Sequence, residues 1–102
     1  MTYARKAPTL VTVSVELFGN ARLLAGRSLL RLNVADDCAL KDIAEAIGRL
    51  HPNLVGTVVR EDLTGFLDSY IVNLNGVEFI DDQHQRLIEG DSLLVFSSLA
   101  GG

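Results

Sequence analysis

The spacing of apolar residues changes once in the first half of the sequence, from every second residue to every third or fourth. This change restricts the possible folds of the chain more than any other feature. In LVTVSVEL, at residues 10–17, apolar and polar side chains alternate strictly, which is typical of a half-buried strand. In ALKDIAEAIGRL, at residues 39–50, apolar side chains recur every three or four residues, which is typical of an amphipathic helix. We therefore expect a sheet with one helix packed across it.

The remaining segments predict an α+β domain with a mixed sheet of four to five strands. Residues 28–34 read as a second strand, paired with the first, and residues 19–28 as a turn between two glycines. The dipeptide Asn75-Gly76 predicts a tight turn between two further strands. Residues 92–96 complete the sheet as a last strand, and residues 53–68 are part short helix and part loop.

The main helix has recognisable ends. Asp36 or Asp37 is expected to cap its start, because acidic side chains suit the positive end of the helix dipole. His51-Pro52 is expected to end it, since the residue before a proline disfavours helical geometry. The apolar stripe between these ends consists of Leu40, Ile43, Ala44, Ile47 and Leu50.

Composition places the chain among ordinary globular proteins of one domain. It has 102 residues, of which 48% are hydrophobic and 22% charged. The single cysteine excludes an internal disulfide, and the first residues show no signal-peptide pattern, so we expect a cytoplasmic protein. No apolar run approaches the roughly 18 residues that a membrane helix needs, so we expect no membrane partner.

The net charge of −4 is unevenly distributed along the chain. Residues 1–60 carry eight Lys or Arg and five Asp or Glu, whereas residues 61–102 carry one arginine and eight acids. An acidic half repels phosphate backbones, so nucleic acid is not an expected partner. The acidic half either steers a basic protein surface toward the chain or only aids solubility.

The two ends differ in character from the middle. Residues 1–8 are predicted to be a disordered arm, residues 9–97 a globular domain, and residues 98–102 a flexible tail that ends in two glycines. Glycine loses the most backbone freedom on ordering, so a terminal pair is either a frayed end or a chemical handle.

The chain resembles ubiquitin-like sulfur carriers of the MoaD/ThiS type in four features. These are the order of the predicted elements, VELFGNARLLAG near the start, EGDSLLVF near the end and the final Ala100-Gly101-Gly102. The resemblance covers residues 9–102 and is nearest to the small subunit of molybdopterin synthase and its longer relatives. It implies a β-grasp fold in which the first and last strands lie side by side.

The resemblance also implies a function for the tail. An E1-like enzyme would use ATP to adenylate the Gly102 carboxylate, which would then become a thiocarboxylate. Gly101 would let the tail enter a narrow channel, because it has no Cβ. The thiocarboxylate would donate sulfur to a synthase, such as the large subunit of molybdopterin synthase. The chain has no phosphate-binding loop of its own, so ATP is used by the partner; no bound cofactor and no independent catalysis are expected.

Several alternatives remain open at this point. The sulfur could serve thiamine thiazole, cysteine or another metabolite instead of molybdopterin. The chain could be a ubiquitin-like modifier that forms isopeptide bonds, or an interaction module with an inert tail.

Phe18 and Phe96 match family positions whose rings pack on the partner enzyme. The alternation of the first strand points Phe18 away from the core, and Phe96 is expected either beside it or in the core. Leu99 and Ala100 in the tail are expected to contact the partner as well.

The family often has two prolines where this chain has Ser97 and Ser98, which predicts a looser tail. Residues 97–102 could span about 20 Å when extended.

Other reactive side chains give weaker signals. Cys38 lies near a helix start, where a thiolate is favoured, but a buried apolar role is the preferred interpretation. His51 and His84 read as surface residues, and the spacing of Asp81, Asp82 and Asp91 fits no calcium loop, so no metal site is expected.

Overall fold

Five strands and two α-helices form the part of the chain that the structure, a computed structural model, describes: residues 9–98. The strands are β1 (Leu10–Leu17), β2 (Leu29–Ala35), β3 (Tyr70–Leu74), β4 (Glu78–Ile80) and β5 (Ser92–Ser97). The helices are α1 (Gly19–Ala25) and α2 (Leu40–Leu50), followed by the short 3-10 helix η1 (Pro52–Leu54). The predicted arm at 1–8 and the tail residues 99–102 lie outside the described residues.

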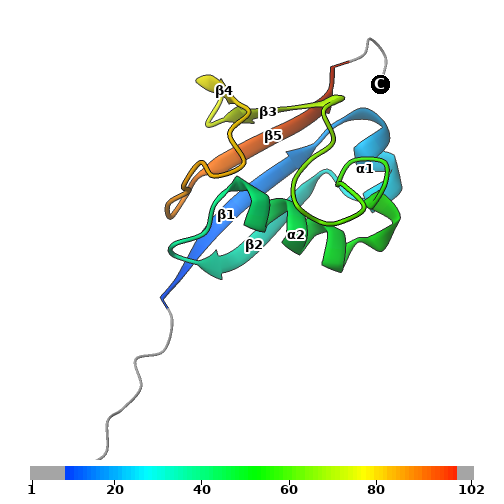
Figure 1. The fold of residues 1–102 in the computed structure, drawn as a ribbon. Coiled ribbons are helices and arrows are strands. Elements are labelled where there is room, and N and C mark those ends of the chain that lie inside the picture. Colours follow the sequence, from blue (N-terminus) through cyan, green and yellow to red (C-terminus); the bar gives the residue numbers. More distant parts are fainter. Residues whose placement is uncertain (1–8, 99–102) are drawn as a thin grey trace, which may run out of the picture.

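The strands form one mixed sheet in the order β2-β1-β5-β3-β4, and α2 lies across one of its faces (Figure 1). The first and last strands are parallel neighbours, with Val15 opposite Leu93, and the other pairs are antiparallel. The predicted α+β, β-grasp architecture is therefore confirmed, with five strands.

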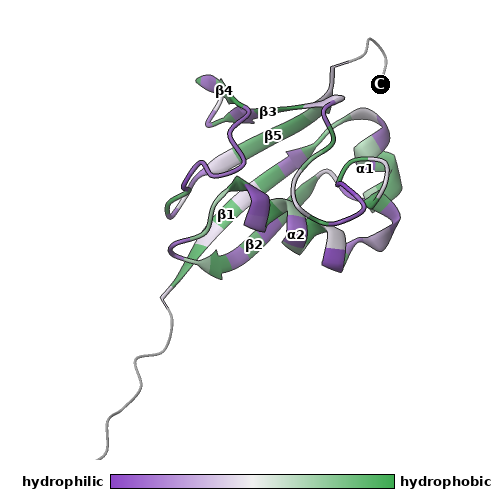
Figure 2. Cartoon of the chain, in the orientation of Figure 1, coloured by the Kyte–Doolittle hydropathy of each residue, from purple (hydrophilic) through white to green (hydrophobic). Residues whose placement is uncertain are grey.

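The core lies between α2 and the sheet. Both predicted periodicities are confirmed here: Val13 and Val15 of β1 and Ile43 and Ile47 of α2 are all fully buried. Hydropathy follows the same division, with an apolar inner side and polar residues along the outer side of α2 (Figure 2). Leu50 is an exception to the predicted stripe, since it is 62% exposed at the last turn of the helix.

The segment that was expected to be a turn, residues 19–28, contains the helix α1. Its two flanking glycines mark the ends of the helix: Gly19 and Gly26 both have positive φ, and the N–H of Gly26 bonds to the carbonyl of Arg22 (3.0 Å). Ala21 is fully buried and anchors the helix to the core. Burial of one side chain in tertiary contact thus stabilises a helix that is too short to form alone.

The predicted cap of α2 is also corrected. The residue at the N-cap position is Ala39, and neither Asp36 nor Asp37 occupies it. The side chain of Asp42 instead accepts a hydrogen bond from the N–H of Ala39 (2.8 Å). This carboxylate lies in the first turn, where a negative charge favours the helix.

Candidate functional site

The face of the sheet that is turned away from α2 remains partly exposed. Strand register assigns side chains to it, because residues directly opposite each other share a face. Glu16 of β1 lies opposite Leu94 of β5, which in turn lies opposite Asn73 of β3. We call this side of the sheet the outer face.

Phe18 and Phe96 meet on the outer face. Phe18 follows β1 directly and is 38% exposed, and its N–H bonds to the carbonyl of Val95 in β5 (3.2 Å). Phe96 is half-buried, and the two ring centroids lie 6.3 Å apart in an edge-to-face arrangement. The prediction that Phe96 lies beside Phe18 is confirmed, and the alternative position in the core is wrong. A role for either ring in partner binding stays a prediction.

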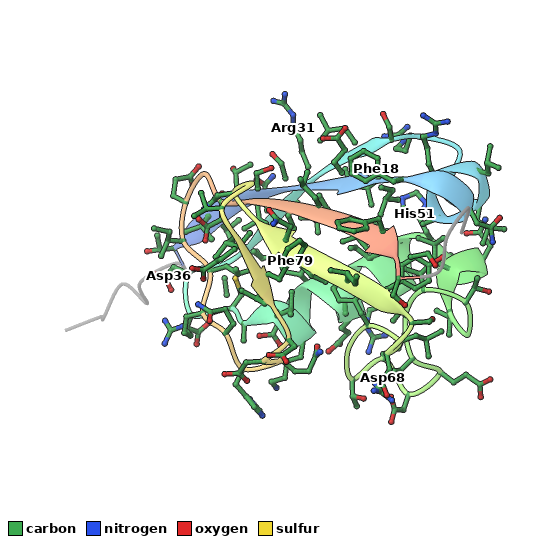
Figure 3. The ribbon with its side chains drawn as sticks, turned by 90° about the horizontal axis from the view of Figure 1, so that it is seen from above. Phe18, Arg31, Asp36, His51, Asp68 and Phe79 are labelled. Carbon is green, nitrogen blue, oxygen red and sulfur yellow. The ribbon has the colours of Figure 1, made fainter. Side chains whose placement is uncertain are left out.

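Phe79 of β4 completes the cluster and was missed by the sequence reasoning. It is 69% exposed, and its ring centroid lies 6.3 Å from that of Phe96. We call Phe18, Phe79 and Phe96 the phenylalanine cluster; Figure 3 labels the first two on the strand side of the molecule. Edge-to-face pairs of this kind add to the stability that burial alone gives.

The register of the β3–β4 hairpin explains why Phe79 was missed. Asn75 and Gly76 both have positive φ, which confirms the predicted tight turn. The ladder resumes with Leu74 opposite Glu78, so Val77 is an additional loop residue. The alternation in GVEFI carried the only signal for Phe79, and a shift of one residue would have reversed its face.

The last described residue, Ser98, is attached to the fold. Its main-chain N–H and its hydroxyl both donate to the carbonyl of Ser69, at 2.8 and 2.9 Å. Ser97 belongs to β5 and lies opposite Tyr70. Ser98 is therefore hydrogen-bonded to the fold, whereas a looser tail than one with prolines stays a prediction. The predicted site residues Leu99, Ala100, Gly101 and Gly102 lie outside the described residues.

An acidic cavity of about 350 Å³ lies at the β4 edge of the sheet. Ile71 and Phe79 form part of its apolar wall, and Asp68 and Asp81 are its two carboxylates. Asp68 also forms an ion pair with Arg60 (2.6 Å), but its side chain is 93% exposed, so solvent screens the pair. The acidic half of the chain therefore borders the phenylalanine cluster.

Cys38 is a buried core residue, as the preferred interpretation held. Its exposure is 3%, and burial, assisted by the carboxylates of Asp42 and Asp37, raises the pKa of its thiol above the ordinary value of 9.0. A thiol of this kind is a poor nucleophile at neutral pH, because the thiolate is the reactive form.

The remaining candidates are dispersed. His84 is exposed, as expected, whereas His51 is half-buried at the end of α2. Asp91 is 7% exposed and accepts hydrogen bonds from Asn75 and Ile88, which is a structural role. Between residues 9 and 98, no three His, Cys, Asp or Glu side chains gather where they could hold a metal ion.

Solved structures resemble this chain along most of its length, although no family model and no curated protein sequence matches it. The small archaeal modifier protein SAMP1 from Haloferax volcanii superposes with a TM-score of 0.76 and 27% identity, over 89% of this chain and 99% of that one. The chain is similar to the ubiquitin-like sulfur-carrier family. 

Two further structures share the fold of this ubiquitin-like chain. A putative molybdopterin converting factor subunit 1 from Pyrococcus furiosus has a TM-score of 0.71 and 23% identity, over 87% of this chain and 99% of that one. A chain in the complex of subunits 1 and 2 of the molybdopterin-converting factor from Helicobacter pylori has a TM-score of 0.58 and 22% identity. The match covers 90% of this chain and 100% of that one. No helix in the described part of the ubiquitin-like chain has the length and apolar character needed to cross a bilayer.

Proposed function

We propose that this chain is a sulfur carrier that acts through the carboxyl group of Gly102. In this proposal an E1-like enzyme binds the chain and ATP, and a synthase later accepts the sulfur. Molybdopterin synthesis is the favoured pathway, because a neighbouring structure is a complex of the two molybdopterin-converting factor subunits. Thiamine thiazole, cysteine or another sulfur-containing metabolite is the alternative destination.

The proposed chemistry has two steps. A carboxylate oxygen of Gly102 attacks the α-phosphorus of ATP, and pyrophosphate leaves, which produces an acyl-adenylate. Hydrosulfide then attacks the acyl carbon and AMP leaves, which produces the thiocarboxylate. Where the donor is a protein persulfide, the first product is an acyl disulfide, and a thiol must reduce it to release the thiocarboxylate.

The observation that most supports this proposal is the position of β5. The strand lies in the middle of the sheet between β1 and β3, and it carries Phe96 two residues before Ser98. A partner that covers the phenylalanine cluster would therefore also meet the point from which residues 99–102 continue. Leu99 and Ala100 would then be the first residues beyond the fold to contact the enzyme.

The test is to incubate the chain with its E1-like enzyme, ATP and sulfide, and to measure the intact mass. We expect one oxygen to be replaced by sulfur, with the change located at Gly102 by fragmentation. A chain with one additional residue after Gly102 is the control and should remain unchanged, because small misplacements of the reacting carbon cost orders of magnitude in rate. Equal sulfur incorporation into both chains, or a label on Cys38, would contradict the proposal.

A second function, as a ubiquitin-like protein modifier, is favoured by the name of the 27% identical neighbour, a small archaeal modifier protein. In that case the acyl-adenylate would react with a lysine amine and form an isopeptide bond. Mass spectrometry of trypsin-digested cell extracts would reveal lysines of other proteins that carry residues 87–102 of this chain, because its last trypsin site is Arg86. Their absence from extracts that contain the thiocarboxylate form would leave the carrier function alone.

A further inference from the structure

Two polar residues in the described part of the chain are almost fully buried, and they differ in their hydrogen bonding. Asp91 is satisfied by Asn75 Nδ2 (3.1 Å) and by the N–H of Ile88 (2.8 Å). Asn73 is 8% exposed, and its Oδ1 has no partner among residues 9–98. Native proteins leave few buried polar atoms unpaired, so the oxygen of Asn73 requires an explanation.

Asn73 lies on the outer face of the sheet, the same face as the phenylalanine cluster. Phe79 lies directly opposite it on β4 and Leu94 directly opposite it on β5. Phe96 lies opposite Ile71, two residues before Asn73 on the same strand. The rings of Phe79 and Phe96 come from the strands on either side of β3 and approach to 6.3 Å, so they meet above β3 and shield Asn73.

The fold does not need an amide at this position. The cross-strand neighbours of Asn73 are apolar, and leucine has the same number and branching of heavy side-chain atoms. An apolar side chain of similar shape in place of an unpaired polar group is commonly neutral or stabilising. The amide therefore points to a role outside the folded chain itself.

We propose that Asn73 is the hydrogen-bonding anchor of the surface that docks the E1-like enzyme, and that it accepts a hydrogen bond from an arginine of that enzyme. The inference rests on the proposed function. Arginine also stacks on aromatic rings, which the phenylalanine cluster offers.

Charge favours a cationic occupant, and the aromatic rings favour arginine over lysine. The cavity beside Phe79 is lined by Asp68 and Asp81, and Glu16 stands across Leu94 on the outer face. Residues 61–98 carry eight carboxylates and a single arginine, Arg86. A cationic group that approaches this edge of the sheet is therefore attracted before it makes contact.

Phe79 must turn aside for the arginine to reach Oδ1. The ring is 69% exposed, and β4 is a three-residue strand at the edge of the sheet. Exposed side chains change rotamer within nanoseconds, so this movement is not a barrier to binding. Phe79 thus covers the amide in the free chain and stacks on the guanidinium in the complex.

The first test compares Asn73→Leu with the control Asn33→Leu, which makes the same change on β2, at the far side of the outer face. Asn33 Oδ1 accepts a hydrogen bond from the Thr12 hydroxyl (3.0 Å), so the control loses a satisfied bond. We expect Asn73→Leu to keep or raise the urea midpoint and to weaken the calorimetric Kd for the purified E1-like enzyme about tenfold or more. The control should bind as the wild type does. The proposal is overturned if Asn73→Leu binds the enzyme with the wild-type Kd, or if both variants lose affinity to the same extent.

The second test identifies the donor by double-mutant cycles between Asn73→Leu and alanine replacements of the enzyme's interface arginines. Coupling to one arginine supports the proposal, and absence of coupling to all of them overturns it. Sulfur transfer to the wild type is measured in parallel. If the wild type accepts sulfur but Asn73→Leu binds normally, only this inference fails. If Asn73→Leu weakens binding but the wild type never accepts sulfur, only the proposed function fails.

Discussion

The carbonyl oxygen of Ser69 accepts two hydrogen bonds from Ser98, one from its main-chain N–H and one from its hydroxyl. The residues beyond this attachment point are residues 99–102. Four extended residues span at most about 13 Å at 3.3 Å per residue, compared with the roughly 20 Å expected for residues 97–102. If an E1-like enzyme acts on Gly102, as proposed, it must accordingly approach the sheet closely.

This short reach predicts that tail length is critical. Deletion of Ala100 brings the carboxyl group about 3.3 Å closer to the fold, and we expect thiocarboxylation to fall by about a hundredfold or more. Intact-protein mass spectrometry after timed incubation with the E1-like enzyme measures this rate. Deletion of Ala4, in the predicted N-terminal arm, is the control and should change neither the rate nor the melting temperature. Normal charging of the shortened chain would show that the enzyme does not require a fixed reach.

The phenylalanine cluster predicts where affinity for the partner resides. We expect Phe18→Ala and Phe96→Asp each to weaken the Kd for the E1-like enzyme about tenfold, because apolar anchors in interfaces commonly contribute this much. The fold should persist, since both rings lie on the outer face. Ile88→Ala removes a 68% exposed side chain before the start of β5 and serves as the control. Unchanged binding of both phenylalanine variants, or unfolding of Phe96→Asp, would refute the assignment.

Gly26 is predicted to be required at the end of α1 for its backbone conformation. Its φ is +77°, and an added Cβ would meet no atom within 4 Å, so the effect of a substitution comes from the backbone alone. We expect Gly26→Ala to reduce the free energy of unfolding by about 1 kcal/mol, since this conformation is costly for residues with a Cβ. Gly26→Asn should lose less, because asparagine tolerates the same conformation. Urea denaturation measures both, and equal stability of the alanine variant would contradict the prediction.

Cys38 predicts a loss of stability at alkaline pH. Because burial and neighbouring carboxylates raise the pKa of the folded thiol, the unfolded chain loses this proton first as pH rises. The unfolded state then binds fewer protons than the folded state, so the free energy of unfolding falls as pH rises above 9.0, the ordinary pKa of the thiol. Below that pH both states are protonated and the contribution is constant.

The measurement is urea denaturation of the wild type and Cys38→Ala at neutral and alkaline pH. The wild type should lose more stability between the two conditions than the variant does, whatever the variant's stability at neutral pH. Parallel losses in the two proteins would show that Cys38 does not carry the effect.

The sequence alone was sufficient for those parts of the fold in which local pattern and tertiary burial agree. The alternation around Val13 and Val15 predicted β1, and the stripe through Ile43 and Ile47 predicted α2, because each element has one face in the core. Asn75-Gly76 predicted its turn, since both residues adopt positive φ readily. The placement of Phe18 and Phe96 followed from alternation together with the adjacency that the family resemblance implied.

Only the tertiary structure decided the remaining features, because each depends on a contact between distant segments. The helix α1 is too short for a clear period, and the burial of Ala21 stabilises it. The position of Phe79 depends on a hairpin register with one additional residue, Val77, and a shift of one residue would reverse its face. The oxygen of Asn73 has no partner within residues 9–98 and is buried because side chains from the strands on both sides of β3 cover it. No local sequence pattern specifies hydrogen bonding across three strands.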